Sequence, residues 1–572
     1  MQTKKCFYAN LKLYKFKNLL YNVSMNTLTL PNNKTISVET GTKIEDILDL
    51  LEIPLENLVA VKINNEICSL TQKIDVNAKI EPVYLNSTQG SAIYRRSLCL
   101  LLATAAHKIF PGKRLLVGHS LGYGYYYTID SENPLTEDDI QKLKNKMIEL
   151  VDKNVEITQS YVSYQEATEL LEKLGLVETR KQLNYICKSK ILMNNLEDFS
   201  DIYFGPLVVK TGVLNIFDLI KYQDGFLLRF PSSRKTEVLT EFEDVPQLFD
   251  VYKRYKEWGK RIGVTSVASL NKIVNDRKTK DFINITETLQ AKQIADIADK
   301  IHAKGTVKVV LIAGPSSSGK TTTSKKLSMQ LKVLGYQPKV IELDTYYLNR
   351  GETPKDENGE YDYECLEALD VKQLNEDLVN LFAGKEVKLP SYNFAEGQRY
   401  YSGKITKLEE NDILIMEGIH GLNDKLTPLI PQEQKFKIYL SALTQLNLDD
   451  HNRIPTSDNR LIRRIVRDAQ YRGKSAADTI KMWPSVQRGE KLHIFPFQGK
   501  ADVMLNTALD YELSVLKVYA MPLLQCVSPN EPEFAEASRL KNFLENFSPI
   551  PVTNVPGQSI IREFVGGSEF KY

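Results

Sequence analysis

Residues 314–321 have the sequence Gly-Pro-Ser-Ser-Ser-Gly-Lys-Thr, and they lie between an apolar segment at 307–313 and a helix-forming segment at 322–334. They match the pattern GxxxxGK[ST] at every fixed position. Between a strand and a helix, small residues let the backbone curl so that its N–H groups converge, and the helix N-terminus adds positive potential. We therefore predict a phosphate-binding loop at these residues; the alternative is an ordinary Gly/Ser connection.

The predicted ligand of this loop is ATP with Mg²⁺ as the second cofactor. Lys320 would neutralise the phosphate being transferred, and the Thr321 hydroxyl would hold the metal ion. We expect ATP to contact a run of loop and helix residues, namely Gly314, Ser316, Ser317, Ser318, Gly319, Lys320, Thr321 and Thr322.

Strands and helices alternate from residue 307 onward. Segments typical of buried strands lie at 307–313, 339–343, 412–416, 436–440 and 502–505, with helical segments between them. This alternation predicts an α/β domain with a parallel sheet covered on both faces.

Two of these strands end in a carboxylate, at Asp344 and at Glu417. The carboxyl ends of strands in such a sheet face the ligand crevice. Glu417 is our candidate for holding the metal ion or its water shell, and the alternative is a solvated strand-end acid. Asp344 could orient a substrate hydroxyl and accept its proton, and the alternative is a helix or turn cap.

Four arginines recur with helical spacing at Arg460, Arg463, Arg464 and Arg467, and Arg472 follows. That spacing places the four guanidinium groups on one face of a helix. The face could be a solvated surface, but beside a phosphate loop we favour a closing lid that neutralises charge in the transition state.

The N-terminal half has a different pattern of predicted strands and helices. Residues 26–85 are rich in short β segments, and an apolar helix at 95–109, a Gly- and Tyr-rich region at 118–127 and a charged helix at 136–153 follow. We predict a multidomain α+β and α/β chain, divided into an extension at 1–24, domains at 25–88 and 89–214, a connecting region at 215–304 and the phosphate-loop domain at 305–572.

Composition is that of an ordinary globular protein and indicates neither a strongly charged chain nor a membrane-spanning one. Hydrophobic residues make up 42%, charged residues 26%, and the net charge is +2, so no global feature requires a polyanionic partner. The six cysteines lie far apart, and no apolar run reaches the length of a membrane span. We predict a cytoplasmic protein. The lysine-containing start, without an acid before Glu39, is an organelle leader or an extension preceding Met25.

Residues 307–516 resemble the uridine kinase and phosphoribulokinase family. The resemblance rests on the phosphate loop, the segments at 344–347 and 390–394, the Glu417-Gly418 strand end and the arginine helix up to Gly473. It implies that Asp344 is the base toward a ribose 5′-hydroxyl and that Arg467 and Arg472 act with it and Lys320. Substrate contacts would come from Tyr347, Glu364, Tyr392, Phe394 and Arg463.

Three positions depart from that family. The histidine with which uridine kinases contact the pyrimidine is replaced by Gly397, the ribose-binding aspartate by Glu364, and the arginine after Gly473 by Lys474. These departures weaken the expectation of uridine or cytidine as substrate, and they leave phosphoryl transfer from ATP untouched.

The N-terminal half resembles a second family. Residues 26–85 are similar to a TGS domain, of β-grasp type, and 91–214 to the second additional (editing) domain of threonyl-tRNA synthetase, on the segments 95–97, 118–127 and 135–139. The metal-binding HxxxH pair of those enzymes falls on Arg96 and Leu100, and the CxxxH counterpart, near 210–214, contains neither Cys nor His. We therefore expect no editing chemistry, and structural roles for His107 and His119.

The leading hypothesis is a kinase that phosphorylates a small-molecule hydroxyl, most simply the 5′-hydroxyl of a nucleoside. A rival from another class is an RNA- or tRNA-binding regulatory protein switched by ATP, and a lesser rival is a kinase of a non-nucleoside alcohol. The sequence leaves the acceptor and the oligomeric state open.

Overall fold

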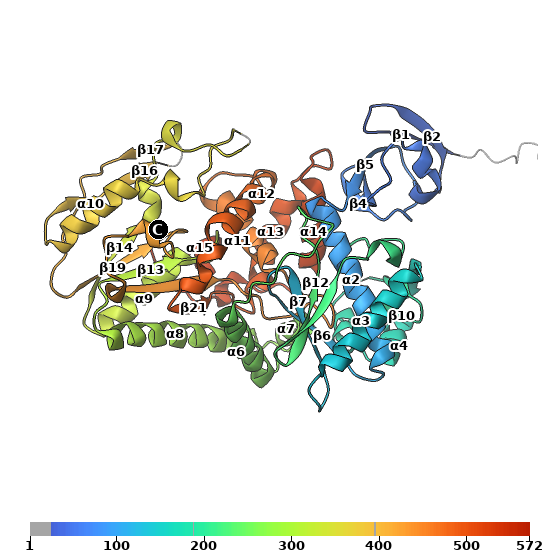
Figure 1. Cartoon of the computed structure of the whole chain (residues 1–572), viewed down its shortest axis with the longest axis horizontal. Helices are drawn as coiled ribbons and strands as arrows, with labels where there is room; N and C mark the ends of the chain where they lie inside the picture. Colours follow the sequence, from blue (N-terminus) through green and yellow to red (C-terminus); the bar gives the residue numbers. More distant parts are fainter. Residues whose placement is uncertain (1–23, 187, 358, 394–395, 572) are drawn as a thin grey trace, which may run out of the picture.

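The computed structural model describes residues 24–186, 188–357, 359–393 and 396–571. Figure 1 shows a small N-terminal module beside a second α+β module, with the phosphate-loop domain on the opposite side of the molecule. Within the described residues, no helix combines the length and apolarity that crossing a bilayer requires.

The N-terminal module is a five-stranded mixed sheet with the strand order β2-β1-β5-β3-β4. Its hydrophobic core is its own, with Leu28, Ile44 and Val61 fully buried. The elements are β1 (Met25–Thr29), β2 (Thr35–Glu39), η1 (Ile44–Leu50), β3 (Leu58–Ile63), β4 (Glu66–Cys68) and β5 (Ala78–Tyr84).

The second module begins with α2 (Thr88–Ile109), which is buried along most of its length and lies between two sheets. One sheet has the order β10-β9-β8 and the other β11-β12-β7-β6. The elements are β6 (Leu115–Ser120), β7 (Gly124–Ile129), α3 (Glu137–Asp152), β8 (Ile157–Ser163), α4 (Tyr164–Lys173), α5 (Val177–Leu183), β9 (Lys190–Leu196), β10 (Phe199–Asp201), β11 (Asp218–Tyr222) and β12 (Gly225–Arg229).

The predicted boundary at residue 214 is too early. β12 pairs with β7 in antiparallel register, Leu227 opposite Tyr126, so residues 218–229 complete the sheet of the second module. This pairing could not be predicted from the sequence because the partner strands lie about a hundred residues apart, and local patterns carry no information on such pairings.

The phosphate-loop domain contains a five-stranded, entirely parallel sheet with the order β14-β19-β13-β20-β21. This confirms the predicted parallel sheet. The strands are β13 (Val309–Ala313), β14 (Gln337–Glu342), β19 (Asp412–Glu417), β20 (Lys435–Ser441) and β21 (Val503–Asn506), and two small ladders add β15 (Val387–Lys388), β16 (Ser391–Asn393), β17 (Gln398–Tyr400) and β18 (Ile405–Thr406).

Two hydrophobic clusters cover the two faces of this sheet, one formed with α8 and α9 and the other with α10. Further helices complete the domain and join it to the second module. The bounds of all these helices, the covering ones included, are α6 (Pro246–Ile262), α7 (Val267–Asn275), α8 (Thr279–Lys304), α9 (Lys320–Val333), α10 (Val371–Phe382), α11 (Thr456–Tyr471), α12 (Ala476–His493), α13 (Glu512–Gln525), α14 (Phe534–Glu545) and α15 (Arg562–Val565).

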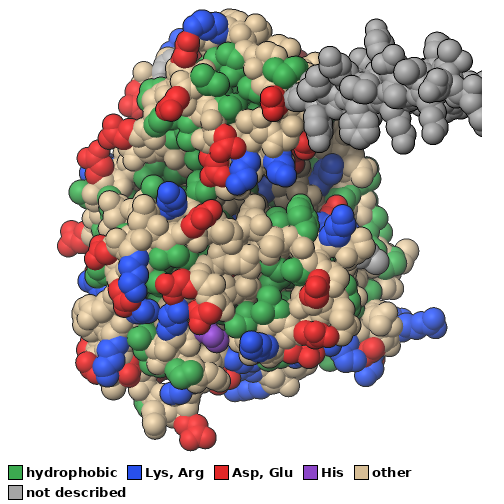
Figure 2. Space-filling model, turned by 90° about the vertical axis from the view of Figure 1, so that its right-hand side faces the viewer, with side chains coloured by type: hydrophobic (Ala, Val, Ile, Leu, Met, Phe, Trp, Pro, Cys, Tyr) green, Lys and Arg blue, Asp and Glu red, His purple; other side chains and the backbone are tan. Residues whose placement is uncertain are grey.

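Helix α6 packs against both halves of the molecule. Phe249 and Tyr252 join the cluster around Tyr126 of β7, while Val251 and Tyr255 join a cluster that includes Tyr439 of β20. The predicted connecting region is therefore part of two cores. On the face shown in Figure 2, acidic and basic side chains are interspersed, with no continuous basic surface.

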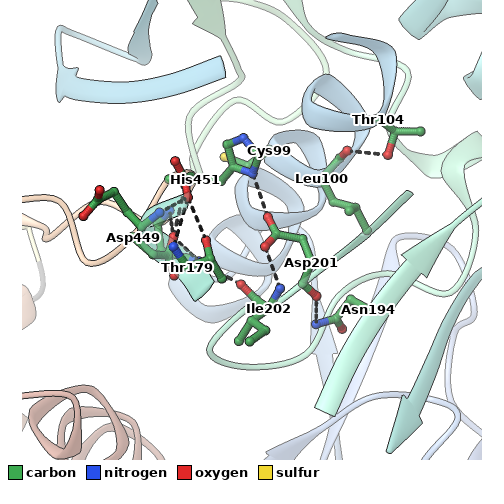
Figure 3. A network of polar contacts seen from close by, with 12 residues as sticks. Cys99, Leu100, Thr104, Thr179, Asn194, Asp201, Ile202, Asp449 and His451 are labelled. Carbon is green, nitrogen blue, oxygen red and sulfur yellow. Dashed lines mark hydrogen bonds and ion pairs between the residues drawn. The ribbon is translucent and has the colours of Figure 1, made fainter. Parts of the chain in front are cut away.

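The segment 447–453, between β20 and α11, docks against the second module (Figure 3). His451 Nδ1 lies 2.7 Å from Asp201 Oδ2, and both side chains are buried. One oxygen of Asp450 accepts from the Thr179 N–H at 2.9 Å, and the other pairs with Arg114 at 2.6 Å. These buried polar contacts join the two halves directly ahead of the arginine helix α11.

Candidate active site

The predicted phosphate loop has the curled backbone that its sequence requires. Ser317 and Gly319 have positive φ values of +59° and +83°. A Cβ at Gly314 would lie 2.5 Å from the carbonyl oxygen of Leu440, so only glycine fits against β20 at this point. Helix α9 begins at Lys320, so its N-terminus faces the loop.

The donors of this loop suit a phosphate ligand. The hydroxyl oxygens of Ser317 and Ser318 are buried without a hydrogen-bond partner, which costs free energy unless a ligand or water accepts from them. Lys320 Nζ lies 3.1 Å from the Gly314 carbonyl oxygen, folded over the loop. The phosphates of ATP fit a site with these donors.

Thr321 and Glu417 meet at the head of the loop, where the Thr321 hydroxyl donates to Glu417 Oε1 at 2.7 Å. Burial raises the pKa of Glu417 to about 7, and nearby Lys320 opposes that rise. A hydroxyl and one carboxylate, completed by phosphate oxygens and water, are the ligands that Mg²⁺ prefers. Within the described ranges, no group of three or more His, Cys, Asp or Glu side chains forms a ready-made metal cage.

Asp344 lies just after β14, in the short 3₁₀ helix η3 (Leu343–Tyr346). Because β14 pairs with β19, Asp344 emerges at the same sheet edge as Glu417. Burial raises the pKa of Asp344, whereas the charges of Lys320, Arg472 and Arg467 lower it. Asp344 and the three cations that influence its pKa are the four residues predicted to act in the reaction, so the structure brings this set together.

Several predicted substrate residues gather beside Asp344. The rings of Tyr347 and Tyr392 lie 5.7 Å apart. Burial raises the pKa of Glu364 to about 7, with Glu490 adding to the rise and Lys320 opposing it. Phe394, also predicted to line this pocket, lies outside the described residues.

Gly397 occupies the position where uridine kinases have a histidine. It has φ +68°, and a Cβ there would lie 2.7 Å from Arg350 Nε. The Arg350 N–H also donates to the Gly397 carbonyl oxygen at 2.8 Å. A histidine would therefore need both a strained backbone and a displaced Arg350.

Three of the four arginines on the face of α11 are buried against the phosphate loop, which differs both from the closing lid that we favoured and from the solvated surface that was its alternative. Arg460 Nη1 and Arg463 Nη1 each donate at 3.1 Å to the carbonyl oxygens of Ser316 and Ser317, and Arg464 Nη1 donates to the Ser316 hydroxyl at 2.8 Å. All three arginines are buried. They hold the backbone of the loop, and Arg463, which was predicted to contact substrate, donates instead to the carbonyl oxygens of Ser317 and Thr507.

Two carboxylates that were not predicted from the sequence compensate these charges. Glu490 of α12 pairs with Arg460 through both oxygens and accepts from the Ser316 N–H at 3.0 Å. Glu512 of α13 pairs with Arg463 at 2.6 Å. Buried arginines require such partners, so the arginine pattern itself was a signal to search for them, although it does not say where in the chain they lie.

The C-terminal segment returns to the phosphate loop, and Figure 1 marks the end of the chain beside the parallel sheet. Glu563 Oε2 accepts from the Thr322 N–H at 3.2 Å and from the Thr322 hydroxyl at 2.6 Å. Thr322 was predicted to contact ATP. Its donors face a carboxylate here, which occupies the anion-favouring N-terminus of α9.

Residues 309–514 match the Phosphoribulokinase / Uridine kinase family model. The chain carries a phosphoribulokinase/uridine kinase family domain. Among solved structures, this chain is similar to a possible uridine kinase from Bacillus stearothermophilus (21% identity, 38% of this chain and 98% of that one, TM-score 0.24). It is also similar to D-glycerate 3-kinase from Cryptococcus neoformans (13% identity, 44% and 87%, TM-score 0.21).

The N-terminal half matches the TGS and editing region of threonine–tRNA ligases. The Maridesulfovibrio salexigens ligase is 28% identical over 190 residues, or 33% of this chain and 30% of that protein. The Clostridium kluyveri ligase is 27% identical over 243 residues, or 41% and 38%. The chain spans about a third of the length of these curated relatives.

In the second module, the two positions that correspond to the HxxxH pair of threonyl-tRNA synthetases are occupied by residues that contact the surrounding protein. Arg96 Nη1 donates to the Pro206 carbonyl oxygen at 2.8 Å, and Leu100 is fully buried in the core of the second module. Burial lowers the pKa of Arg96 to about 10, so it remains a cation at neutral pH and does not ligate a metal.

Proposed function

We propose that this protein is a kinase that transfers the γ-phosphoryl group of Mg²⁺-ATP to a hydroxyl of a small molecule, with the 5′-hydroxyl of a nucleoside as the favoured acceptor. The observation that carries the proposal is the meeting of Lys320, the Thr321–Glu417 pair and Asp344 at the mouth of a curled phosphate loop. A lysine, a metal position and a candidate base are the parts that phosphoryl transfer to an alcohol requires.

Each residue has a distinct part in this proposal. ATP supplies the phosphoryl group, and Lys320 leaves the Gly314 carbonyl to neutralise the phosphates. Asp344 accepts the proton of the attacking hydroxyl, and its raised pKa makes it a better acceptor than a solvated aspartate. Arg467 and Arg472, whose charges act on Asp344, would stabilise negative charge on the phosphoryl oxygens.

One structural observation supports an acceptor other than a pyrimidine nucleoside. Arg350 lies against Gly397, where a pyrimidine-contacting histidine would stand in uridine kinases. This arrangement favours an acceptor other than uridine or cytidine, such as another nucleoside or a non-nucleoside alcohol.

A substrate screen tests the proposal. Full-length protein with Mg²⁺-ATP is incubated with nucleosides, sugars and other small alcohols, and phosphorylated products are measured. One class is expected to stimulate ATP turnover; Lys320→Ala should abolish it, and Asp344→Asn should lower kcat by about 10²–10⁴-fold. No stimulation by any acceptor, with intact ATP binding, would contradict the proposed activity.

The rival function, ATP-switched RNA binding, predicts tRNA affinity that changes with ATP and little acceptor-stimulated turnover. The interspersed charges on the face in Figure 2 do not favour a broad RNA-binding surface there. Filter binding of tRNA with and without ATP separates the two functions.

A further inference from the structure

Five basic side chains lie near one another where the second module meets the kinase-family domain. We call them the cationic cluster: Arg95 and Arg96 of α2, Arg234 after β12, Arg453 before α11 and Lys491 of α12. The Arg453 guanidinium lies 5.0 Å from the ring centroid of Tyr125, and that of Arg95 lies 5.4 Å from the ring centroid of Phe230. The two rings are 4.7 Å apart. Two guanidinium groups from different domains therefore flank one aromatic pair.

The cluster lacks counter-charges. In the part of the chain that the structure describes, none of its five members forms an ion pair with a carboxylate, and the Nε atoms of Arg95 and Arg453 are buried without an acceptor. Arg95, Arg96 and Arg453 are half-buried, and Arg234 and Lys491 are exposed. Cations gathered in one place repel one another unless an anion compensates them.

The acids near the cluster are already engaged. Asp450 is held by Arg114 and by the N–H groups that begin α5, and Asp449 accepts from the Asn452 side chain. Glu490, next to Lys491, is held by Arg460. The missing negative charge therefore has no source among these neighbouring carboxylates.

The members of the cluster influence one another. Desolvation lowers the pKa of Lys491, Arg95 and Arg234 lower it further, and Glu490 opposes this fall. Desolvation also lowers the pKa of Arg96 to about 10, with Arg539 the larger and Arg95 a smaller contributing charge. The geometry shows the same arrangement, since guanidinium groups from two domains flank one aromatic pair with no carboxylate of the described residues paired to either of them.

We propose that the cationic cluster is a second anion site, separate from the phosphate loop, that binds a small molecule bearing more than one phosphate group. Guanidinium forks match phosphate oxygens in pairs, and several cations in one place suit a polyphosphate better than a single carboxylate. The site lies between two domains, so its ligand would contact both.

Two helices connect this site to the phosphate loop. Arg453 lies three residues before α11, whose Arg460 donates to the Ser316 carbonyl oxygen. Lys491 follows Glu490, which accepts from the Ser316 N–H. A ligand that draws Arg453 and Lys491 together would therefore act on both elements that hold Ser316.

A binding measurement tests the site independently of kinase activity. The full-length Lys320→Ala variant, which weakens the phosphate loop as a competing site, is titrated with inorganic pyrophosphate by calorimetry. The same titration is repeated after adding Arg95→Gln and Arg453→Gln, and, as a matched control, after adding Arg261→Gln, an exposed arginine of α6. A single-stranded RNA oligonucleotide serves as a competitor.

We expect one saturable pyrophosphate site, weakened about tenfold or more by the paired substitution and unchanged by the control, since hydrogen bonds between charged groups contribute about this much. Without ligand, Arg453→Gln alone should raise Tm by relieving repulsion, whereas a structural arginine would lower it. Absent or unsaturable binding, equal loss in the control, or stronger binding of the RNA through the same arginines would overturn the proposal.

Discussion

At the scale of single residues, Glu417 shows how burial prepares a side chain for a metal ion. Burial raises its pKa to about 7, so below neutral pH a proton competes with Mg²⁺ for the carboxylate. We predict that Mg²⁺-ATP affinity rises with pH up to about 7 and then levels off, with about tenfold weaker binding one pH unit below the pKa. Calorimetry in two buffers of different ionisation enthalpy should detect proton release on binding, and Glu417→Gln should remove it. Binding that releases no proton near pH 7 would contradict the assignment of Glu417.

At the scale of elements, the arginines of α11 and its C-terminal end have two different roles, one in stability and one in the reaction. Arg463 is fully buried on Glu512, whereas the Arg472 side chain at the end of the helix is 48% exposed. We predict that Arg463→Met lowers the free energy of unfolding by about 3–5 kcal/mol, because it leaves Glu512 buried and unpaired. Arg472→Met should leave the denaturation midpoint nearly unchanged and lower kcat instead. Urea titrations and steady-state kinetics of both variants distinguish the stabilising role of Arg463 from the catalytic role of Arg472. A loss of stability in both variants would argue against this difference.

At the scale of the whole molecule, the His451–Asp201 pair joins the two halves. Burial alone would lower the pKa of His451, but Asp201 and the neighbouring aspartates raise it above its ordinary value. The pair therefore stabilises the junction fully below pH about 6.5, and this contribution is lost as the pH rises through the higher folded-state pKa. We predict that His451→Gln flattens this pH dependence of Tm in calorimetry, while His302→Gln, at an exposed position, does not. An unchanged pH profile in His451→Gln would exclude a stabilising charge on His451.

The sequence alone predicted the parts of this protein whose physics is local. The curled loop at 314–321 follows from its small residues and its place between strand and helix, and the strand-end positions of Asp344 and Glu417 follow from the alternation of apolar segments. The helix α3 could likewise be placed from its charged first turn and its apolar spacing.

Partners that meet across long stretches of chain could be identified from the three-dimensional fold and not from local sequence patterns. The burial of Arg460 and Arg463 depends on Glu490 and Glu512, 30 and 49 residues away, and the extra strands of the second module depend on pairing with β7. Helical periodicity shows that the arginines share a face, but the same pattern is compatible with a solvated surface, a closing lid or a face buried against the loop. What decides between them is whether a carboxylate from elsewhere in the fold compensates the cost of burying the charge.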